Sequence, residues 1–97
     1  MLTSKQRAQL RGMANGVDAI FQIGKGGVGD QLIRQVGETL EKRELIKVRV
    51  LESAGCTARE AAERVAAETG ADVVQVIGSR FTLYKRSEDD PRIVLVK

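Results

Sequence analysis

Hydrophobic residues recur along this chain with two different periods, three to four residues in some segments and two in others. Helical spacing predicts three helices, over residues 2–14, 30–43 and 57–70. Short apolar or alternating runs predict four strands, at residues 19–23, 45–51, 73–77 and 80–85. The predicted order of elements is therefore α-β-α-β-α-β-β.

Polar residues at the predicted helix starts match known capping patterns. Thr3 with Gln6 three residues later, and Thr57 with Glu60, form two capping boxes, in which side chains pair with otherwise unpaired backbone N–H groups. Asp30 is the expected N-cap of the second helix. These signals fix where each helix should begin.

Glycines and their neighbours mark the predicted ends and turns. Asn15-Gly16 and Gly70 should end the first and third helices, because these residue types tolerate the left-handed conformation of a C-cap. Gly78-Ser79 is a hairpin signal between the last two strands. Gly37 lowers helix stability within the second helix, so we expect a close approach to a neighbouring element there.

The second predicted strand alternates in polarity. Ile46, Val48 and Val50 share one face, whereas Lys47 and Arg49 share the other. Helices should therefore cover mainly one face of the sheet, and the last hairpin should be antiparallel. The predicted fold class is α/β, a two-layer sandwich with a mixed four-stranded sheet.

The length of 97 residues suits one domain spanning residues 1–97. Residues 88–90 are acidic and predict a turn, after which residues 93–96 would form either an edge strand or a packed tail. Glu38 and Glu41 lie at surface spacing on the second helix and predict a solvated face.

Composition removes several classes of function. The chain has no histidine and one cysteine, Cys56, which excludes His-dependent triads, multi-cysteine metal sites and an internal disulfide. We therefore expect no enzyme activity, no cofactor and no metal, with Cys56 a small residue in a turn. The sequence shows neither a leader pattern nor an apolar run of about 20 residues, so a cytoplasmic location is expected.

The charge balance is mildly basic. The net charge is +3, and residues 1–86 carry 14 basic against 10 acidic residues, or +4. This bias is compatible with binding a polyanion, although charge alone favours ordinary solubilising surface charge.

The glycine-rich segment between the first strand and the second helix has three interpretations. Gly24, Gly26 and Gly29 match the G-x-G-x-x-G pattern of dinucleotide-binding domains, and Glu52 has the spacing of a ribose-binding acid. Against this, the chain is too short for that fold, and the strand with Lys47 and Arg49 is polar on one face.

The second interpretation is a G-x-x-G clamp for a nucleic-acid backbone at residues 24–27. Missing side chains would let a phosphate approach backbone N–H groups and the positive end of the following helix, and Lys25 adds a cation. The third interpretation is a tight turn that needs positive φ angles.

Four segments carry a recognisable pattern, namely residues 2–7 leading to 10–11, residues 23–28, residues 44–48, and residues 74–78 before 83–84. Together they resemble the CRM domain (chloroplast RNA splicing and ribosome maturation) in its stand-alone bacterial, YhbY-like form. The resemblance implies an RNA-binding fold similar to the C-terminal domain of translation initiation factor three, and association with precursors of the large ribosomal subunit. The family's G-x-x-G loop falls on residues 24–27, and the acidic residues 88–90 lie outside the pattern.

The expected function is therefore RNA binding in ribosome assembly, by a monomer without a membrane or small-molecule partner. The alternative is a small nucleotide-cofactor module that uses the G-x-G-x-x-G-like loop. The candidate RNA-binding residues are Gly24, Lys25, Gly26 and Gly27 in the loop, Lys5, Arg7 and Arg11 on the first helix, and Lys47, Arg49, Arg80 and Lys85 on the sheet and hairpin.

Overall fold

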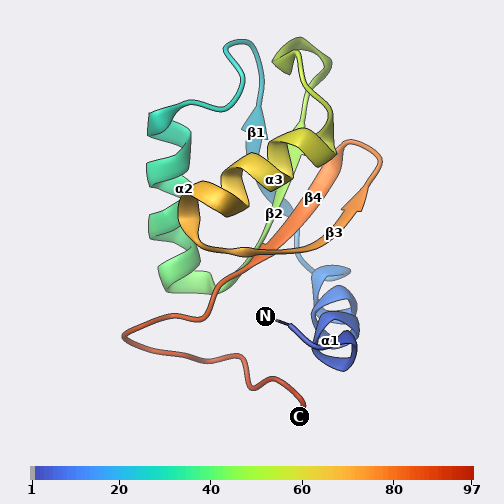
Figure 1. Cartoon of the computed structure of the whole chain (residues 1–97), viewed down its shortest axis with the longest axis vertical. Helices are drawn as coiled ribbons and strands as arrows, with labels where there is room; N and C mark the ends of the chain where they lie inside the picture. The colour runs from blue at the N-terminus through green and yellow to red at the C-terminus, as the bar shows by residue number, and fades with distance from the viewer. Residues whose placement is uncertain (1) are drawn as a thin grey trace.

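The computed structural model describes residues 2–97 and shows the predicted order of elements (Figure 1). The elements are α1 (Ser4–Ala14), β1 (Ala19–Ile23), α2 (Asp30–Arg43), β2 (Leu45–Val50), the 3-10 helix η1 (Glu52–Ala54), α3 (Ala58–Thr69), β3 (Asp72–Ile77) and β4 (Arg80–Tyr84). Every predicted helix and strand is present, with boundaries shifted by at most two residues.

The four strands form one mixed sheet in the order β1-β2-β4-β3. β1 and β2 are parallel, whereas β4 pairs antiparallel with both β2 and β3. The turn at residues 78–79 joins β3 to β4 as predicted. The mixed four-stranded α/β fold predicted from the sequence is confirmed.

α2 and α3 cover one face of the sheet (Figure 1). Ile46 and Val48 from β2, with Phe81 and Leu83 from β4, are fully buried beneath these helices. The alternation of β2 puts Lys47 and Arg49 on the opposite face, as predicted. This layer holds the larger of the two clusters of buried residues. Because burying a large apolar side chain contributes about 1.5–3 kcal/mol, it supplies most of the hydrophobic stabilisation of the fold.

The opposite face of the sheet changes character along its length. At one end α1 packs Leu10 and Ala14 against Leu45, Val74 and Tyr84, which forms a second buried cluster. Beyond α1, no helix within residues 2–97 covers this face (Figure 1). The sandwich therefore has two layers over most of its length, with α1 closing one end of the second face.

The two predicted capping boxes are confirmed. The Thr3 hydroxyl accepts from the Gln6 N–H at 3.1 Å, and the Thr57 hydroxyl accepts from the Glu60 N–H at 3.1 Å. The prediction for α2 is wrong, because its N-cap is Gly29, and Asp30 is the first helical residue.

The first and third helices end where predicted, whereas the conformation expected at Asn15 and the close approach expected at Gly37 are not observed. Gly70 ends α3 in the left-handed conformation at φ 76°, as predicted. Asn15, which ends α1, is right-handed at φ −61°, because the chain continues into a turn that needs no positive φ. No neighbour lies within 4 Å of the position a Cβ would take at Gly37, so the expected close approach there is absent.

Residues 87–97 form a packed tail with no strand. Gln9 of α1 pairs with the tail backbone twice, donating to the Val94 carbonyl and accepting from the Val96 N–H, both at 2.8 Å. Ile93 and Leu95 pack against the cluster around α1. Of the two alternatives for this segment, the tail is the one observed.

Two carboxylates of α2 and its C-cap hold the start of this tail. Glu44 is 1% exposed and accepts from the N–H groups of Ser87, Arg92 and Ile93 at 2.7–2.9 Å. Glu41 accepts from the Ser87 hydroxyl and from the Glu88 N–H. The prediction that Glu41 belongs to a merely solvated face is therefore wrong.

Candidate functional site

The glycine loop follows β1 directly and leads into α2. Its turn is closed by a hydrogen bond from the Gly27 N–H to the Gly24 carbonyl at 2.9 Å. Gly26 and Gly27 have backbone φ angles of 100° and 65°, which residues other than glycine rarely adopt. Lys25 is exposed at the tip.

A tight turn alone accounts for only part of this composition. It requires Gly26 and Gly27, and a Cβ on Gly27 would also lie 3.3 Å from the Ala54 carbonyl oxygen. Gly24 has no positive φ, and a Cβ there would make only ordinary contacts of 3.5 Å to Leu51 and 3.6 Å to Ser53. Gly24 is thus not demanded by the turn and leaves the backbone uncovered.

The helix that follows the loop begins differently from the other two. α1 and α3 have capping boxes, whereas the N-cap of α2, Gly29, makes no side-chain hydrogen bond. The first N–H groups of α2 therefore lack a side-chain acceptor and can receive an external one. Asp30 places a negative charge at this end, so an anion is better placed nearer Lys25 and Gly26.

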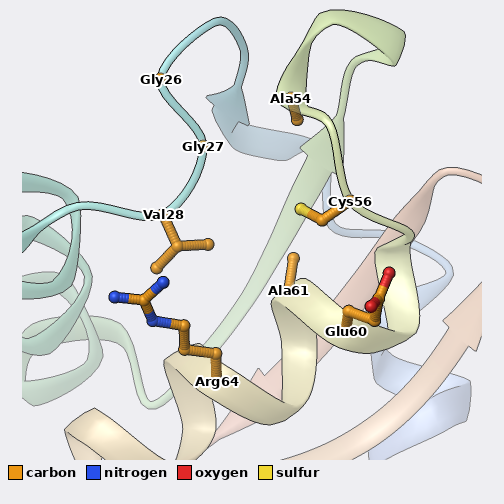
Figure 2. A pocket seen from close by; sticks show the side chains of 8 residues that line it. All are labelled: Gly26, Gly27, Val28, Ala54, Cys56, Glu60, Ala61 and Arg64. Atoms are coloured by element: carbon orange, nitrogen blue, oxygen red, sulfur yellow. The ribbon is translucent and has the colours of Figure 1, made fainter.

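A cavity of about 330 Å³ opens between the loop, the turn after η1 and α3 (Figure 2). Its lining residues are Gly26, Gly27, Val28, Ala54, Cys56, Glu60, Ala61 and Arg64. Arg64 reaches from α3 toward Val28, and the Cys56 sulfur points toward the cavity (Figure 2). Sequence reasoning missed Arg64, because it is one of several exposed charges on α3 and only the packing of α3 beside the loop distinguishes it.

The uncovered sheet face carries a second group of cations. Arg49 on β2 and Arg80 on β4 are exposed direct partners across the strands. Both line a hollow of about 450 Å³, together with Lys47, Gln22 and Asp18. Like charges directly opposite one another destabilise a sheet, so the Arg49–Arg80 pair does not contribute to the stability of the fold. This favours the binding of an anion as its role.

Lys47 and Lys85, by contrast, already have structural partners. The Lys47 ammonium donates to the Ala14 carbonyl at the end of α1, at 2.8 Å. The Lys85 ammonium donates to the Thr69 carbonyl at the end of α3, at 2.9 Å. Each cation satisfies a helix C-terminus, which favours a stabilising role over direct contact with a ligand.

The candidate residues on α1 are separated from the loop. Lys5 and Arg11 are exposed and Arg7 is half-buried. The loop and α1 lie toward opposite ends of the molecule, which extends 39 Å along its longest axis (Figure 1). These three cations are therefore not adjacent to the loop, and the open sheet face lies between the two.

The geometry does not fit the dinucleotide interpretation. A doubly wound dinucleotide-binding sheet is parallel and covered on both faces, whereas two of the three strand pairs here are antiparallel and one face is open. Glu52 lies in η1 and is exposed rather than ending β2. Across residues 2–97 no group of three acidic, Cys or His residues could hold a metal, and no described helix is long and apolar enough to cross a membrane.

The sequence profile of the CRS1 / YhbY (CRM) domain matches residues 2–85, which include the loop, the sheet and all three helices. The chain belongs to the CRM family. The matched range ends before the tail that Glu41 and Glu44 hold.

Relatives of this CRM protein are named for RNA binding. Probable RNA-binding protein YqeI of Bacillus subtilis is 44% identical over 95 residues, covering 98% of this chain and 99% of that one. A protein of Haemophilus influenzae named RNA-binding protein is 31% identical over 88 residues, covering 91% and 89% of the two chains. The solution structure of SAV1595 from Staphylococcus aureus, described as a candidate RNA-binding protein, superposes with a TM-score of 0.78 at 43% identity, covering 99% of this chain and all of that one.

Proposed function

We propose that this CRM protein binds RNA without catalysing a reaction, and that the loop at residues 24–27 holds the RNA backbone. The observation that carries the proposal is the combination of an uncovered glycine turn with a helix start that has no side-chain cap. Backbone N–H groups and the Lys25 ammonium together provide donors and positive charge for a phosphate. The names of the relatives and the family membership support RNA as the polyanion.

Arg49 and Arg80 extend the proposed RNA surface onto the open sheet face. Arg49 pairs across the strands with Gln22, one residue before the end of β1, and β1 leads directly into the loop. One RNA strand can therefore pass from the loop onto this face. Lys47 and Lys85 contribute positive charge to the surrounding field, because their donors are used within the fold.

Lys5, Arg7 and Arg11 belong to a separate part of the proposed surface. Their position on α1, beyond the open sheet face, would bring them to a different segment of a folded RNA than the loop contacts. A large structured RNA offers such separated segments. The proposal therefore predicts that loop and α1 variants weaken the binding of short RNAs unequally, with the loop dominant.

Within this proposal the protein acts as a monomer in the cytoplasm, on precursors of the large ribosomal subunit. The CRM family resemblance supports this role. Cross-linking in cells followed by sequencing of the bound RNA tests it. We expect enrichment of precursors of large-subunit ribosomal RNA, and enrichment of messenger or transfer RNA alone would contradict the ribosomal role.

Absorbance of the purified protein separates RNA binding from cofactor binding. Co-purifying RNA gives excess absorbance at 260 nm that ribonuclease removes, whereas a bound dinucleotide survives ribonuclease. A ribonuclease-resistant excess would favour the cofactor alternative. Absence of both, together with no salt-sensitive binding of added RNA, would contradict the proposed function.

A further inference from the structure

The walls of the cavity beside the loop are chemically unlike a phosphate site. Val28, Ala54 and Ala61 contribute apolar surface, and the Cys56 thiol adds a weakly polar group. The only charged side chains are those of Glu60 and Arg64, whose charges cancel. The Thr57 backbone and hydroxyl groups bond the Glu60 carboxylate and lower its pKa, so it is negative at neutral pH. An anion would gain little in this cavity.

A flat, neutral group with polar edges fits these walls better. At about 330 Å³ the cavity lies at the lower end of the range of about 300–1,000 Å³ for small-ligand pockets. It can accept one aromatic ring system but not a stacked base pair. Arg64 can cover such a ring with its planar guanidinium, which stacks on nucleobases.

The cavity and the loop share two residues, Gly26 and Gly27. A nucleotide whose phosphate sits on the outer side of the loop therefore has its base within reach of the cavity. We propose that this cavity holds one unpaired nucleobase of the bound RNA, with Arg64 stacked on it. The inference rests on the proposed function and adds that the preferred RNA has an unpaired nucleotide.

The single cysteine of the chain reports directly on occupancy. Cys56 lines the cavity, so a bound base should block its alkylation by iodoacetamide. The rate of Cys56 alkylation is measured on the full chain, first free and then saturated with either a single-stranded RNA or a blunt RNA duplex of the same length. We expect slower alkylation, by about tenfold, with the single strand and an almost unchanged rate with the duplex.

A second measurement does not depend on the cysteine. Affinity is compared for a base-containing single strand and a fully abasic strand with the same number of phosphates, using wild type, Arg64→Ala and the control Arg59→Ala. Arg59 is also exposed on α3 but does not line the cavity. Base stacking predicts that wild type and Arg59→Ala prefer the strand with bases by about tenfold, and that Arg64→Ala loses most of this preference.

The outcomes separate the two claims. In one outcome RNA binding is salt-sensitive, but wild type binds the abasic and the base-containing strand equally and Cys56 is alkylated as fast as in the free protein. This outcome would overturn the proposal that the cavity holds a base and leave the proposed function intact. Equal protection of Cys56 by duplex and single strand would also overturn the proposal of a base in the cavity, because paired bases cannot enter. No binding of any RNA would overturn the proposed function and this inference with it.

Discussion

Replacing Glu44 by glutamine should detach the C-terminal tail and destabilise the fold. Oε1 of Glu44 accepts from the Arg92 and Ile93 N–H groups at 2.7 and 2.8 Å, and Oε2 accepts from the Ser87 N–H at 2.9 Å. Glutamine keeps one acceptor oxygen and places an NH₂ group opposite one of these donors. Glu44 also has a positive φ of 66°, the only such non-glycine residue among those described.

The magnitude follows from the number of lost acceptors. Leaving the nearly buried Ser87 N–H unpaired costs about 1–3 kcal/mol, and the remaining bonds lose the benefit of a charged acceptor. We expect a loss of about 3 kcal/mol in the free energy of unfolding. In a domain of this size that lowers Tm by roughly 12–24 °C. If the tail separates while the rest stays folded, the loss is limited to the free energy of tail docking.

Thermal denaturation and amide hydrogen exchange test this prediction together. The exchange of the Ser87, Arg92 and Ile93 amides should accelerate in Glu44→Gln. The matched control is Glu38→Gln, which removes the same charge from an exposed position on α2 and should stay within about 0.5 kcal/mol of wild type. An unchanged Tm with unchanged exchange at the three amides would refute the reasoning.

Three further predictions concern stability. Gly70→Val should cost about 1 kcal/mol or more, because its φ of 76° is one that a β-branched residue resists; an unchanged melting curve would contradict the assignment of this C-cap. Gly37→Ala should stabilise by about 0.5–1 kcal/mol, since the site is helical and open, and a lower Tm would show an unrecognised contact. Acid should weaken the tail: burial alone raises the pKa of Glu44, but the N–H groups of Ser87, Ile93 and Arg92 outweigh it and hold the pKa below its usual 4.5. This stabilisation is present above pH 4.5 and is lost as the pH falls through the lowered pKa. The difference in stability between wild type and Glu44→Gln should therefore shrink on acidification. A difference that stays constant would contradict the role of the ionised Glu44 carboxylate.

Local signals predicted most of the fold. Apolar periodicity and the capping boxes at Thr3 and Thr57 determine structure over a few neighbouring residues, and these predictions are confirmed. The strand order β1-β2-β4-β3 depends on pairing between distant segments, which periodicity does not encode. Asp30 failed as an N-cap because Gly29, in an extended conformation, already ends the loop.

Three residues whose roles sequence reasoning missed, Glu44, Lys47 and Arg64, act over long distances in the chain. Glu44 binds backbone groups 43–49 residues away, so nothing near it in the sequence marks the role. The alternating pattern of the strand predicts that Lys47 is a surface cation without a partner. In the fold its ammonium instead donates to the Ala14 carbonyl of α1, 33 residues earlier in the chain. Arg64 becomes part of the candidate site only because α3 packs beside the loop. The glycine loop was visible because its conformational demand is local.

The salt dependence of RNA affinity, in wild type and in Lys25→Glu, tests most directly whether the loop holds the RNA backbone. Lys25→Glu changes an exposed side chain and leaves the glycine φ angles untouched, whereas an aspartate at Gly26 or Gly27 would also strain the turn. The control is Lys42→Glu, which changes the net charge equally at an exposed site in the last turn of α2.

Affinity for a short single-stranded RNA is measured between about 50 and 200 mM salt. With about four cations engaged, log K should fall against log salt with a slope near −3 in wild type and in Lys42→Glu. Lys25→Glu should bind more weakly and show a slope shallower by about 0.7, the loss of one phosphate contact. A flat salt dependence in wild type, or a Lys25→Glu variant that binds as the control does, would contradict the account.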